Sequence, residues 1–531
     1  MGKTQIDRDF PSLELSATII AVPPAKTTFT KKHMLDLKFI AENQQLVIEN
    51  AKHKNIAIDV AAIVELDKQR RELIKKTEDL RAEQKRLGKD EIDKAKHLKE
   101  EFRKLEPELE KARASLDRLV AEVPNMILAS TPVGANETEN KVERKKGKQT
   151  TFKGFKPLDH IELGKNLNIL DLEKAAEMSG ARFYYLKGQA ALLELALVQF
   201  VMQKLVNKGF TPIIPPVLVK EHAMFATGFF PAEKNEIYSV NPEEDDLYLI
   251  GTSEVPLTML HANETLHEKD LPLRYCAFST CFRREAGSYG KDTKGIIRVH
   301  QFDKIEMFSF CHPEKSEEEH EFLVGIEEEI VSELGIPYQV INICSGDLGA
   351  PAAKKFDIEA WIPTQNRYRE VTSCSNCTDY QARRAHIKFK PENGNPETQK
   401  PDLIHTLNGT AVAMPRTIVA ILENFQNKDG SVTIPEVLRQ YMGGKDKIEA
   451  AKPGAEAGWQ SLIQSLPARQ NTTTQHSSLL RNTLFHQKQI RFDITTKITR
   501  IPLATRLNGG VVAWVVARPA EAGHTATKKP I

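Results

Sequence analysis

The strongest constraint on the fold is a pair of apolar series with heptad spacing between residues 60 and 121 of this 531-residue chain. The first series repeats every seven residues, and the second advances in alternating steps of four and three. Both spacings place one apolar stripe along a helix, as in a coiled coil. Gly88 breaks the pattern between them, so the two helices are expected to fold back as an antiparallel hairpin. The series are Leu66, Leu73, Leu80 and Leu87, then Leu98, Phe102, Leu105, Leu109, Ala112, Leu116 and Leu119.

The first of these helices, at about 28 residues, would be roughly 40 Å long. That length exceeds what a compact core can cover, which predicts a projecting arm. Pro107 interrupts the second helix, so a kink or a restarted helix is expected there. Two interpretations stay open: a solvated coiled coil that contacts another protein, or an arm whose Lys and Arg residues contact a nucleic-acid backbone. The charge pattern alone favours the first.

Composition is that of an ordinary soluble globular protein, with 40% hydrophobic and 27% charged residues. The net charge of +2 does not announce a polyanionic partner, so any nucleic-acid contact has to come from local basic patches. No run reaches the length of a membrane helix, and no secretory signal opens the chain, which makes the cytoplasm the default location. The six cysteines therefore read as reduced thiols. Cys374 and Cys377 have metal-ligand spacing, but no second pair completes a zinc site, so a structural role is favoured.

The chain divides into four parts by composition. Residues 1–33 form an N-terminal extension and residues 446–531 a C-terminal extension, and neither receives a function. Residues 34–150 hold the helical arm and a linker, and residues 151–445 read as mixed α and β. The basic run at 141–148 fits a solvated linker better than a nuclear signal or a phosphate-binding patch.

Within 151–445, an apolar helix over about 189–207 leads into a Pro-rich strand at 210–219. Since Pro is confined to sheet edges or strand starts, this strand is expected at an edge, covered either by a partner subunit or within one subunit. Later strand-like runs are joined by turns and insertions, which favours an antiparallel sheet with helices packed on it. These runs lie near 246–250, 273–282, 296–310, 337–344, 356–363, 368–374 and 404–413.

Two of these runs carry the pattern of a nucleotide pocket. Arg283 can grip a phosphate with its guanidinium fork, and Glu285, two residues on, shares its strand face and can accept from an amino group. Phe302 on the neighbouring run can cover a base. A Gly-rich loop, 286–290, joins the two runs. The alternative is an ordinary charged hairpin.

This pattern resembles the second signature motif of class II aminoacyl-tRNA synthetases. Taken with the hairpin, the segment from about Met34 to Lys445 resembles a seryl-tRNA synthetase of the bacterial type. The resemblance implies an α+β protein: an antiparallel coiled-coil arm followed by a catalytic domain with an antiparallel β-sheet flanked by helices. The matching segments are 209–216, 251–254, 282–306, 370–384 and 407–424.

In this family ATP activates L-serine as seryl-adenylate, which is then transferred to tRNA(Ser). The resemblance thus implies ATP and L-serine as substrates, Mg²⁺, a tRNA partner gripped by the arm, a homodimer and no membrane; tRNA(Sec) is a second candidate substrate. Neither step needs a protein nucleophile, so positioning and charge stabilisation are expected to dominate.

The resemblance also assigns residues. The catalytic residues are Arg283, Glu285 and Arg416. The ATP-binding residues are Arg283, Arg284, Glu285, Arg298, Val299, Phe302, Glu370, Val371, Thr372, Ser373 and Arg416. The serine-binding residues are Thr252, Ser253, Glu254, Arg283, Glu306, Asn408 and Thr410. The Mg²⁺ ligands are Glu370 and Ser373.

In these roles Arg283 holds the α-phosphate, Glu285 the adenine amino group, and Arg298 the outer phosphates. Phe302 and Arg416 sandwich the adenine ring.

For serine, Thr252 and Glu254 bind the ammonium group and Glu306 the hydroxyl, while Thr410 closes the pocket near Asn408. A pocket built to hydrogen-bond a hydroxyl rejects alanine, because its polar groups would be left unpaired.

Two competing functions remain at this point. A related ligase could load an amino acid onto a carrier protein, but such an enzyme has little use for the hairpin. A catalytically inactive paralogue could bind RNA, but the presence of Arg283, Glu285, Glu306, Glu370 and Arg416 argues against it.

Overall fold

The computed structural model describes residues 36–88, 90–241, 244–286, 294–392 and 400–450. The N-terminal extension, nearly all of the C-terminal extension and most of the Gly-rich loop at 286–290 lie outside the described residues.

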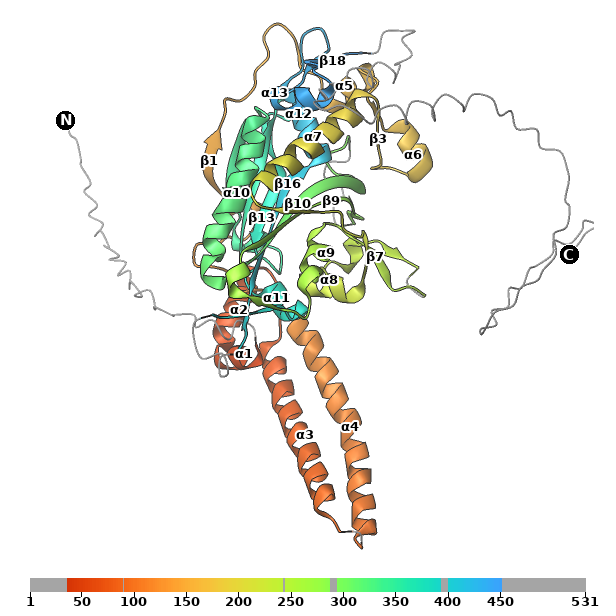
Figure 1. The fold of residues 1–531 in the computed structure, drawn as a ribbon, viewed down its shortest axis with the longest axis vertical. Helices are drawn as coiled ribbons and strands as arrows, with labels where there is room; N and C mark the ends of the chain where they lie inside the picture. Colours follow the sequence, from red (N-terminus) through yellow and green to blue (C-terminus); the bar gives the residue numbers. More distant parts are fainter. Residues whose placement is uncertain (1–35, 89, 242–243, 287–293, 393–399, 451–531) are drawn as a thin grey trace, which may run out of the picture. The chain divides into compact units, whose positions relative to one another are not determined.

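The N-terminal region is helical, as expected. Two short helices, α1 (Leu37–Glu42) and α2 (Gln44–His53), precede the long helices α3 (Val60–Arg86) and α4 (Ile92–Ala121). Figure 1 shows α3 and α4 running side by side as an antiparallel hairpin. Asp59 starts α3, because its side chain accepts a hydrogen bond of 2.9 Å from the amide of Ala62.

The predicted apolar seam holds the hairpin together. Every residue of the two series is buried or partly buried, and Leu98, Leu109 and Leu116 are buried. Near the tip, the guanidinium carbon of Arg81 lies 4.5 Å from the ring centre of Phe102. The coiled-coil hairpin is therefore confirmed.

Pro107 does not restart α4, contrary to one of the two expectations. The helix runs without interruption from Ile92 to Ala121 with Pro107 inside it. Pro107 is exposed, while Leu105 and Leu109 on either side belong to the seam. Seam packing against α3 compensates for the hydrogen bond that a proline removes.

The base of the hairpin packs against the rest of the chain. Ile63 and Leu116 share a core with Phe39 and Ile40 of α1. Lys54, which follows α2, donates to the carbonyl oxygens of Gly349, Ala350 and Ala352 at 3.1, 3.0 and 2.7 Å.

The remaining described residues are built on an eight-stranded sheet of order β1-β11-β12-β13-β16-β10-β9-β4. All neighbours pair antiparallel except β4 and β9, which are parallel. The antiparallel sheet is therefore confirmed. The strands are β1 (Lys141–Lys146), β4 (Thr211–Ile213), β9 (Leu273–Phe282), β10 (Gln301–Cys311), β11 (Tyr338–Asn342), β12 (Lys354–Ile362), β13 (Arg367–Asn376) and β16 (His405–Ala413).

The sequence predicted one of the two edge strands of this sheet and missed the other. β4 is the expected edge strand and contains Pro212. The basic run at 141–148, predicted as a solvated linker, instead forms edge strand β1 along β11. Its side chains are exposed, and Arg144 donates to Glu328 at 2.5 Å. A Lys-rich strand is well suited to an edge because its charges oppose pairing with another chain.

Three helices cover one face of the sheet: α7 (Gln189–Asn207), α10 (Ser316–Glu333) and α12 (Met414–Asn424). They share one apolar core with inward residues of the strands, among them Ile305 and Met307 of β10. Lys304 and Glu306 alternate with these two and point to the opposite face, where the cavity described below lies.

Helix α7 corrects one expectation. By length and composition it could cross a membrane, although no run was expected to reach that length. Leu193, Leu197 and Leu205 of α7 are fully buried in the core beside the sheet, as in the central helix of a globular domain.

The smaller elements fill the connections. They are α5 (His160–Asn166), β2 (Leu170–Asp171), α6 (Glu173–Ser179), β3 (Tyr185–Leu186), β5 (Leu218–Lys220), α8 (Glu221–Thr227), β6 (Ser239–Val240), β7 (Leu247–Leu249), α9 (Glu254–Thr258), β8 (Thr265–His267), α11 (Tyr380–Ala385), β14 (Lys388–Lys390), β15 (Asp402–Leu403), β17 (Val432–Thr433), α13 (Glu436–Arg439) and β18 (Lys447–Ile448). The pairing of β17 with β18 carries this region slightly past residue 445.

Candidate active site

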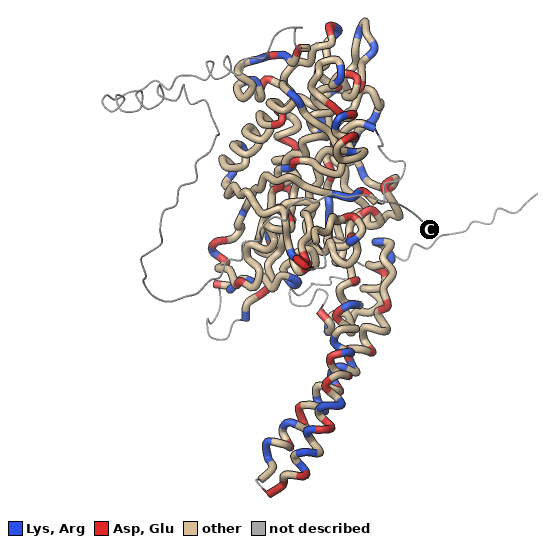
Figure 2. The backbone as a smooth tube through the Cα atoms, turned by 90° about the vertical axis from the view of Figure 1, so that its right-hand side faces the viewer, with Lys and Arg blue, Asp and Glu red and all other residues tan. Residues whose placement is uncertain are grey.

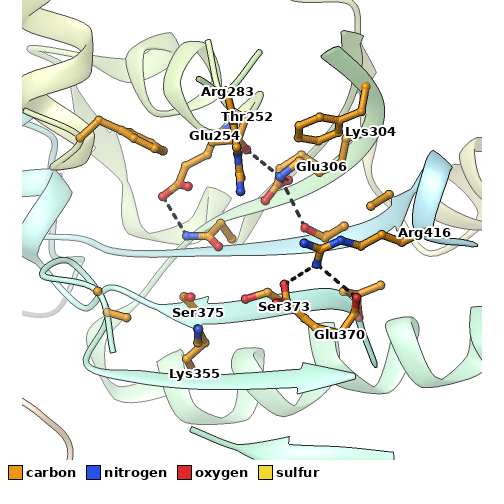
Figure 3. A pocket seen from close by; sticks show the side chains of 18 of the residues that line it. Thr252, Glu254, Arg283, Lys304, Glu306, Lys355, Glu370, Ser373, Ser375 and Arg416 are labelled. Atoms are coloured by element: carbon orange, nitrogen blue, oxygen red, sulfur yellow. Dashed lines mark hydrogen bonds and ion pairs between the residues drawn. The ribbon is translucent and has the colours of Figure 1, made fainter. Parts of the chain in front are cut away.

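A cavity of about 390 Å³ opens on the sheet face opposite α7, α10 and α12. Its walls come from β10, β13, β16, the start of α12 and the segments around residues 252, 283 and 298. Figure 3 shows the labelled side chains Thr252, Arg283, Glu306, Glu370 and Arg416 around it. Most of the residues predicted from the sequence line it. They are Thr252, Glu254, Arg283, Glu285, Arg298, Val299, Phe302, Glu306, Glu370, Val371, Thr372, Ser373, Asn408, Thr410 and Arg416.

Two predicted residues are not brought to the cavity wall. The amide of Arg284 donates to the carbonyl of Glu236 at 2.8 Å, and its side chain does not line the cavity. The hydroxyl of Ser253 is fully buried against that of Ser279, 2.6 Å away. Each is adjacent in sequence to a residue that does line the cavity. Adjacent side chains point in different directions, so only one of each pair reaches the cavity wall.

One end of the cavity pairs an arginine with an aromatic ring. The guanidinium carbon of Arg283 lies 5.5 Å from the ring centre of Phe302, and its Nε donates to the carbonyl of Gly251 at 3.2 Å. Arg298 donates to the carboxylate of Glu285 at 2.5 Å. Glu285 adopts a φ of 51°, a backbone conformation that non-glycine residues rarely take and that is common at functional sites.

A second arginine lies on the facing wall. Arg416, in the first turn of α12, contacts the carboxylate of Glu370 at 3.0 Å and donates through Nε to the carbonyl of Ile297 at 3.3 Å. Burial in the cavity opposes ionisation of Glu370, but the charges of Arg416, Lys355 and Arg283 outweigh it and lower the pKa of that carboxyl. The Glu370 side chain remains 46% exposed to the cavity, as expected of a carboxylate that keeps its charge.

A β-bulge explains how Glu370 and Ser373 come to line the same wall. Residues three apart in a regular strand point to opposite faces. The register of β13 against β12 shifts at this point, because Thr372 pairs with Ile358 and Glu370 with Glu359, which leaves Val371 as the extra residue. Thr372 instead donates through its hydroxyl to Glu327 of α10 at 2.7 Å.

The inner end of the cavity contains a charged residue that the sequence patterns did not single out. Lys304 is buried and donates to the hydroxyls of Thr252 at 2.9 Å and Thr410 at 3.4 Å. It also forms an ion pair with Glu306 (Figure 3). Because Lys304 precedes Glu306 by two positions on one strand, the shared strand face was a signal that could have revealed it.

Glu254 lies beside this cluster. One of its oxygens accepts from Gln381 at 2.6 Å and from Asn408 at 2.8 Å. Burial, followed by the nearby charge of Glu306, raises the pKa of Glu254 to about 7. Ser375 also lines the cavity, and it shares the strand face of Ser373, which lies two positions before it. Glu233 and Lys355 line the cavity too, and they lie outside the short sequence segments that carried the resemblance to the family.

Neither Cys374 nor Cys377 belongs to a metal cluster. Within the described ranges, no group of three or more His, Cys, Asp or Glu residues could hold a metal ion. Burial raises the pKa of both thiols well above the usual range, with Glu327 and Glu254 adding to the effect at Cys374 and Cys377 respectively. Cys377 lines the cavity, and its sulfur lies 3.7 Å from the amide nitrogen of Asn408.

Comparison with known proteins gives concordant results. Residues 34–127 match the model of the seryl-tRNA synthetase N-terminal domain, and residues 237–425 match the class II core domain of the tRNA synthetases for G, H, P, S and T. The serine–tRNA ligase of Rhodococcus jostii is 45% identical over 423 residues, which cover 77% of this chain and 99% of the relative. That of Thermobifida fusca is 46% identical, with 77% and 98% covered.

Solved structures agree with the sequence relatives. The seryl-tRNA synthetase of Pyrococcus horikoshii, complexed with ATP, superposes with a TM-score of 0.72 at 42% identity and covers 79% of this chain and all of its own. The cytoplasmic serine–tRNA ligase of Naegleria fowleri, in complex with AMP, gives a TM-score of 0.71 at 35% identity with the same coverage.

Proposed function

Because this chain belongs to the seryl-tRNA synthetase family, we propose that its cavity is where ATP activates L-serine and where seryl-adenylate is transferred to tRNA(Ser). The chain is a class II aminoacyl-tRNA ligase for serine, and ATP is a substrate. The observation that carries the residue assignments is the division of one cavity between an arginine–aromatic end and a polar inner end.

At the arginine–aromatic end the adenine ring lies between Phe302 and Arg416, with Glu285 accepting from its amino group. Arg283 holds the α-phosphate and stabilises the charge that grows there as the serine carboxylate attacks. The position of the Arg283 guanidinium beside Phe302 supports this arrangement. Arg298 binds the outer phosphates of ATP, and its hydrogen bond to Glu285 is partly replaced by contacts with these phosphates.

At the inner end Thr252 and Glu254 bind the serine ammonium group and Glu306 binds the hydroxyl. Asn408 and Thr410 close the pocket. To these we add Lys304 as a positioning residue, since it holds both threonine hydroxyls and pairs with Glu306. Ser253, hydrogen-bonded to Ser279 behind the wall, would support the pocket from outside.

Glu370 and Ser373 would hold Mg²⁺ together with the phosphates of ATP. Both offer hard oxygen ligands from one wall, and few protein ligands suffice because Mg²⁺ keeps several waters. The lowered pKa of Glu370 supports the fit, since a cation site requires the ionised carboxylate. When bound, Mg²⁺ neutralises charge on the phosphates.

The α3–α4 hairpin would grip tRNA(Ser) through its backbone and shape, as duplex RNA favours. Figure 2 shows Lys and Arg interspersed with Asp and Glu along both helices. Serylation of tRNA(Sec) would use the same hairpin. Since such a ligase acts where translation occurs, we place it in the cytoplasm.

We further propose a homodimer formed at the β4 edge. What supports it is a set of exposed apolar side chains at β4 and on the helix α7 beside it: Ile214, directly after β4, is 86% exposed, and Leu195 and Val206 of α7 are 55% and 46% exposed. An apolar group at an unpaired sheet edge is typical of a surface that another chain covers.

We also propose a division of the chain into an arm region at 34–150, a catalytic region at 151–445 and two extensions.

The test is ATP–pyrophosphate exchange with each of the twenty amino acids, without tRNA. Exchange with serine alone is expected, and Arg283→Ala should reduce it by about a thousandfold or more while the melting temperature holds. Arg144→Ala, on the distant strand β1, is the matched control. Exchange with another amino acid would overturn the roles of Glu306 and Thr410. No exchange by the wild type would favour an inactive paralogue.

A further inference from the structure

A buried histidine outside the segments that match the family contacts α12, the helix that carries Arg416. His160, the first residue of α5, is 3% exposed, and its Nδ1 lies 2.9 Å from Glu423 of α12. The same oxygen of Glu423 accepts a hydrogen bond from the His160 main-chain amide at 3.1 Å. The other carboxylate oxygen of Glu423 accepts from the Thr364 hydroxyl at 2.5 Å. Glu423 is fully buried, so these bonds satisfy a carboxylate that water cannot reach.

The other ring nitrogen of His160 holds the main chain of a distant segment. Its Nε2 accepts from the amide of Ile296 at 3.3 Å. Because Nδ1 faces a carboxylate, the ring proton belongs on Nδ1, which leaves Nε2 free to accept. The fit is close at Gly295, where a Cβ would come within 1.9 Å of Nε2 and where φ is +73°. Only glycine suits that position.

The segment held in this way forms part of the cavity wall. Ile297, Arg298 and Val299 line the cavity, while Ile296 just before them is fully buried. The carbonyl of Ile297 accepts from Arg416. Helix α12 therefore holds this segment at two points. Arg416 of α12 binds the carbonyl of Ile297 directly, and Glu423 of α12 holds His160, which in turn binds the amide of Ile296.

We propose that His160 is a positioning residue for ATP: it fixes the main chain at Ile296 and so places Arg298 and Val299 against the nucleotide. This inference rests on the proposed function, which assigns those two residues to ATP. His160 does not line the cavity and exchanges no proton with substrate. The serine-binding residues stand on other segments, so the effect of losing His160 should fall on ATP and not on serine.

The test compares two substitutions that each keep one of the two ring contacts. In His160→Asn the side-chain amide can replace Nδ1 toward Glu423 but cannot reach Ile296. In His160→Gln the longer amide can replace Nε2 toward Ile296. Loss of the Ile296 contact should raise the KM for ATP about tenfold, the size of one hydrogen bond, with the KM for serine unchanged. His160→Gln should show a smaller increase than His160→Asn.

His261→Asn is the matched control. His261 bridges Glu264 and the Tyr275 hydroxyl, each at 2.8 Å, and lies outside the cavity lining. This variant should leave both KM values unchanged. If His160→Asn lowered the melting temperature or kcat with an unchanged KM for ATP, or raised both KM values alike, His160 would be a packing residue and the inference would be wrong.

ATP binding to the full-length protein is also measured by titration calorimetry. This measurement separates the two proposals. A wild type that binds ATP but shows no serine-dependent exchange would contradict the proposed function. The effect of His160→Asn on the Kd for ATP would still decide the inference about His160. If His160→Asn does not fold, Thr364→Val takes its place. Removing the outer hydrogen bond to Glu423 should weaken ATP binding about threefold, and an unchanged Kd would overturn the inference.

Discussion

The carboxyl group of Glu254 is proposed to bind the serine ammonium group, and its raised pKa predicts that serine binding depends on pH. Burial and the charge of Glu306 raise its pKa to about 7. Below that pH the group is neutral and cannot pair with the serine ammonium. The kcat/KM for serine in pyrophosphate exchange should therefore rise about tenfold per pH unit on the acid side and level off above about pH 7.

The check is a profile of kcat/KM for serine with wild type and Glu254→Gln at saturating ATP. The variant should be less active and should lose this rising limb, because its side chain does not titrate. A variant that keeps the same limb would show that another group is responsible.

Lys304 provides the second prediction at this scale. Lys304→Met leaves Glu306 buried without its cation, which should destabilise the fold by about 3 kcal/mol and raise the KM for serine at least about a hundredfold. Thermal unfolding and pyrophosphate exchange measure the two effects.

The double variant Lys304→Met, Glu306→Gln separates the effect on stability from the effect on serine activation. It removes the unpaired charge, so the melting temperature should recover while serine activation stays low. Recovery of both would overturn the roles proposed for Lys304 and Glu306 in serine binding.

At the scale of elements, the bulge in β13 decides which of its side chains face the cavity. It turns Glu370 and Ser373 to one wall, whereas a regular strand would send one of them to the helices. A second register shift lies in the pairing of β10 with β16, between Ile305 and Glu306. Both irregularities fall where strands carry site residues, so the polar wall depends on local departures from regular pairing.

The hairpin supports a prediction about the second half-reaction. Deleting residues 71–107 and joining the helices by a short turn keeps Ile63 and Leu116 in the core at the hairpin base. Serine-dependent pyrophosphate exchange should remain within about twofold, while charging of tRNA(Ser) should fall by about a thousandfold, because binding energy remote from the reacting groups is lost. Retained charging would refute the proposed tRNA grip.

A control for this deletion is a variant with reversed charge on the exposed faces of the hairpin but an intact seam. It should also exchange normally and charge poorly, which would assign the effect to contacts with the tRNA backbone. Its charging should depend less on salt than that of the wild type, because fewer contacts with phosphates release fewer counterions.

At the scale of the whole molecule, the β4 edge predicts association. Ile214→Asp places a charge in the exposed apolar group and should shift the sedimentation mass from two chains to one. Leu260→Asp, at an exposed leucine outside that group, is the control and should not change the mass. A wild type that sediments as a monomer would contradict the proposed dimer.

Local repetition explains how much of the fold could be predicted from the sequence. The seam from Leu66 to Leu119 followed from spacing along the chain, which fixes which side chains share a face. The antiparallel sheet followed from the turns and insertions that join the strand-like runs. The ordered motifs likewise indicated Arg283, Phe302, Glu306 and Arg416, all of which line one cavity. Strand β1 was missed because its basic composition resembles a linker, and only its pairing with β11 makes it a strand.

By itself, then, the sequence determined the hairpin, the type of sheet, the family and most of the cavity lining, since these depend on periodicity, on how consecutive strands are connected and on motifs contained in short segments. Only the tertiary structure decided that Lys304 fills the inner end of the cavity, that a bulge brings Glu370 to the wall of Ser373, and that His160 holds Ile296. Each of these depends on contacts between residues far apart in sequence or on a one-residue shift in pairing. Spacing along the chain can place Lys304 on the strand face of Glu306, but it carries no record of the contacts with Thr252 and Thr410, because such contacts arise only when separate elements pack.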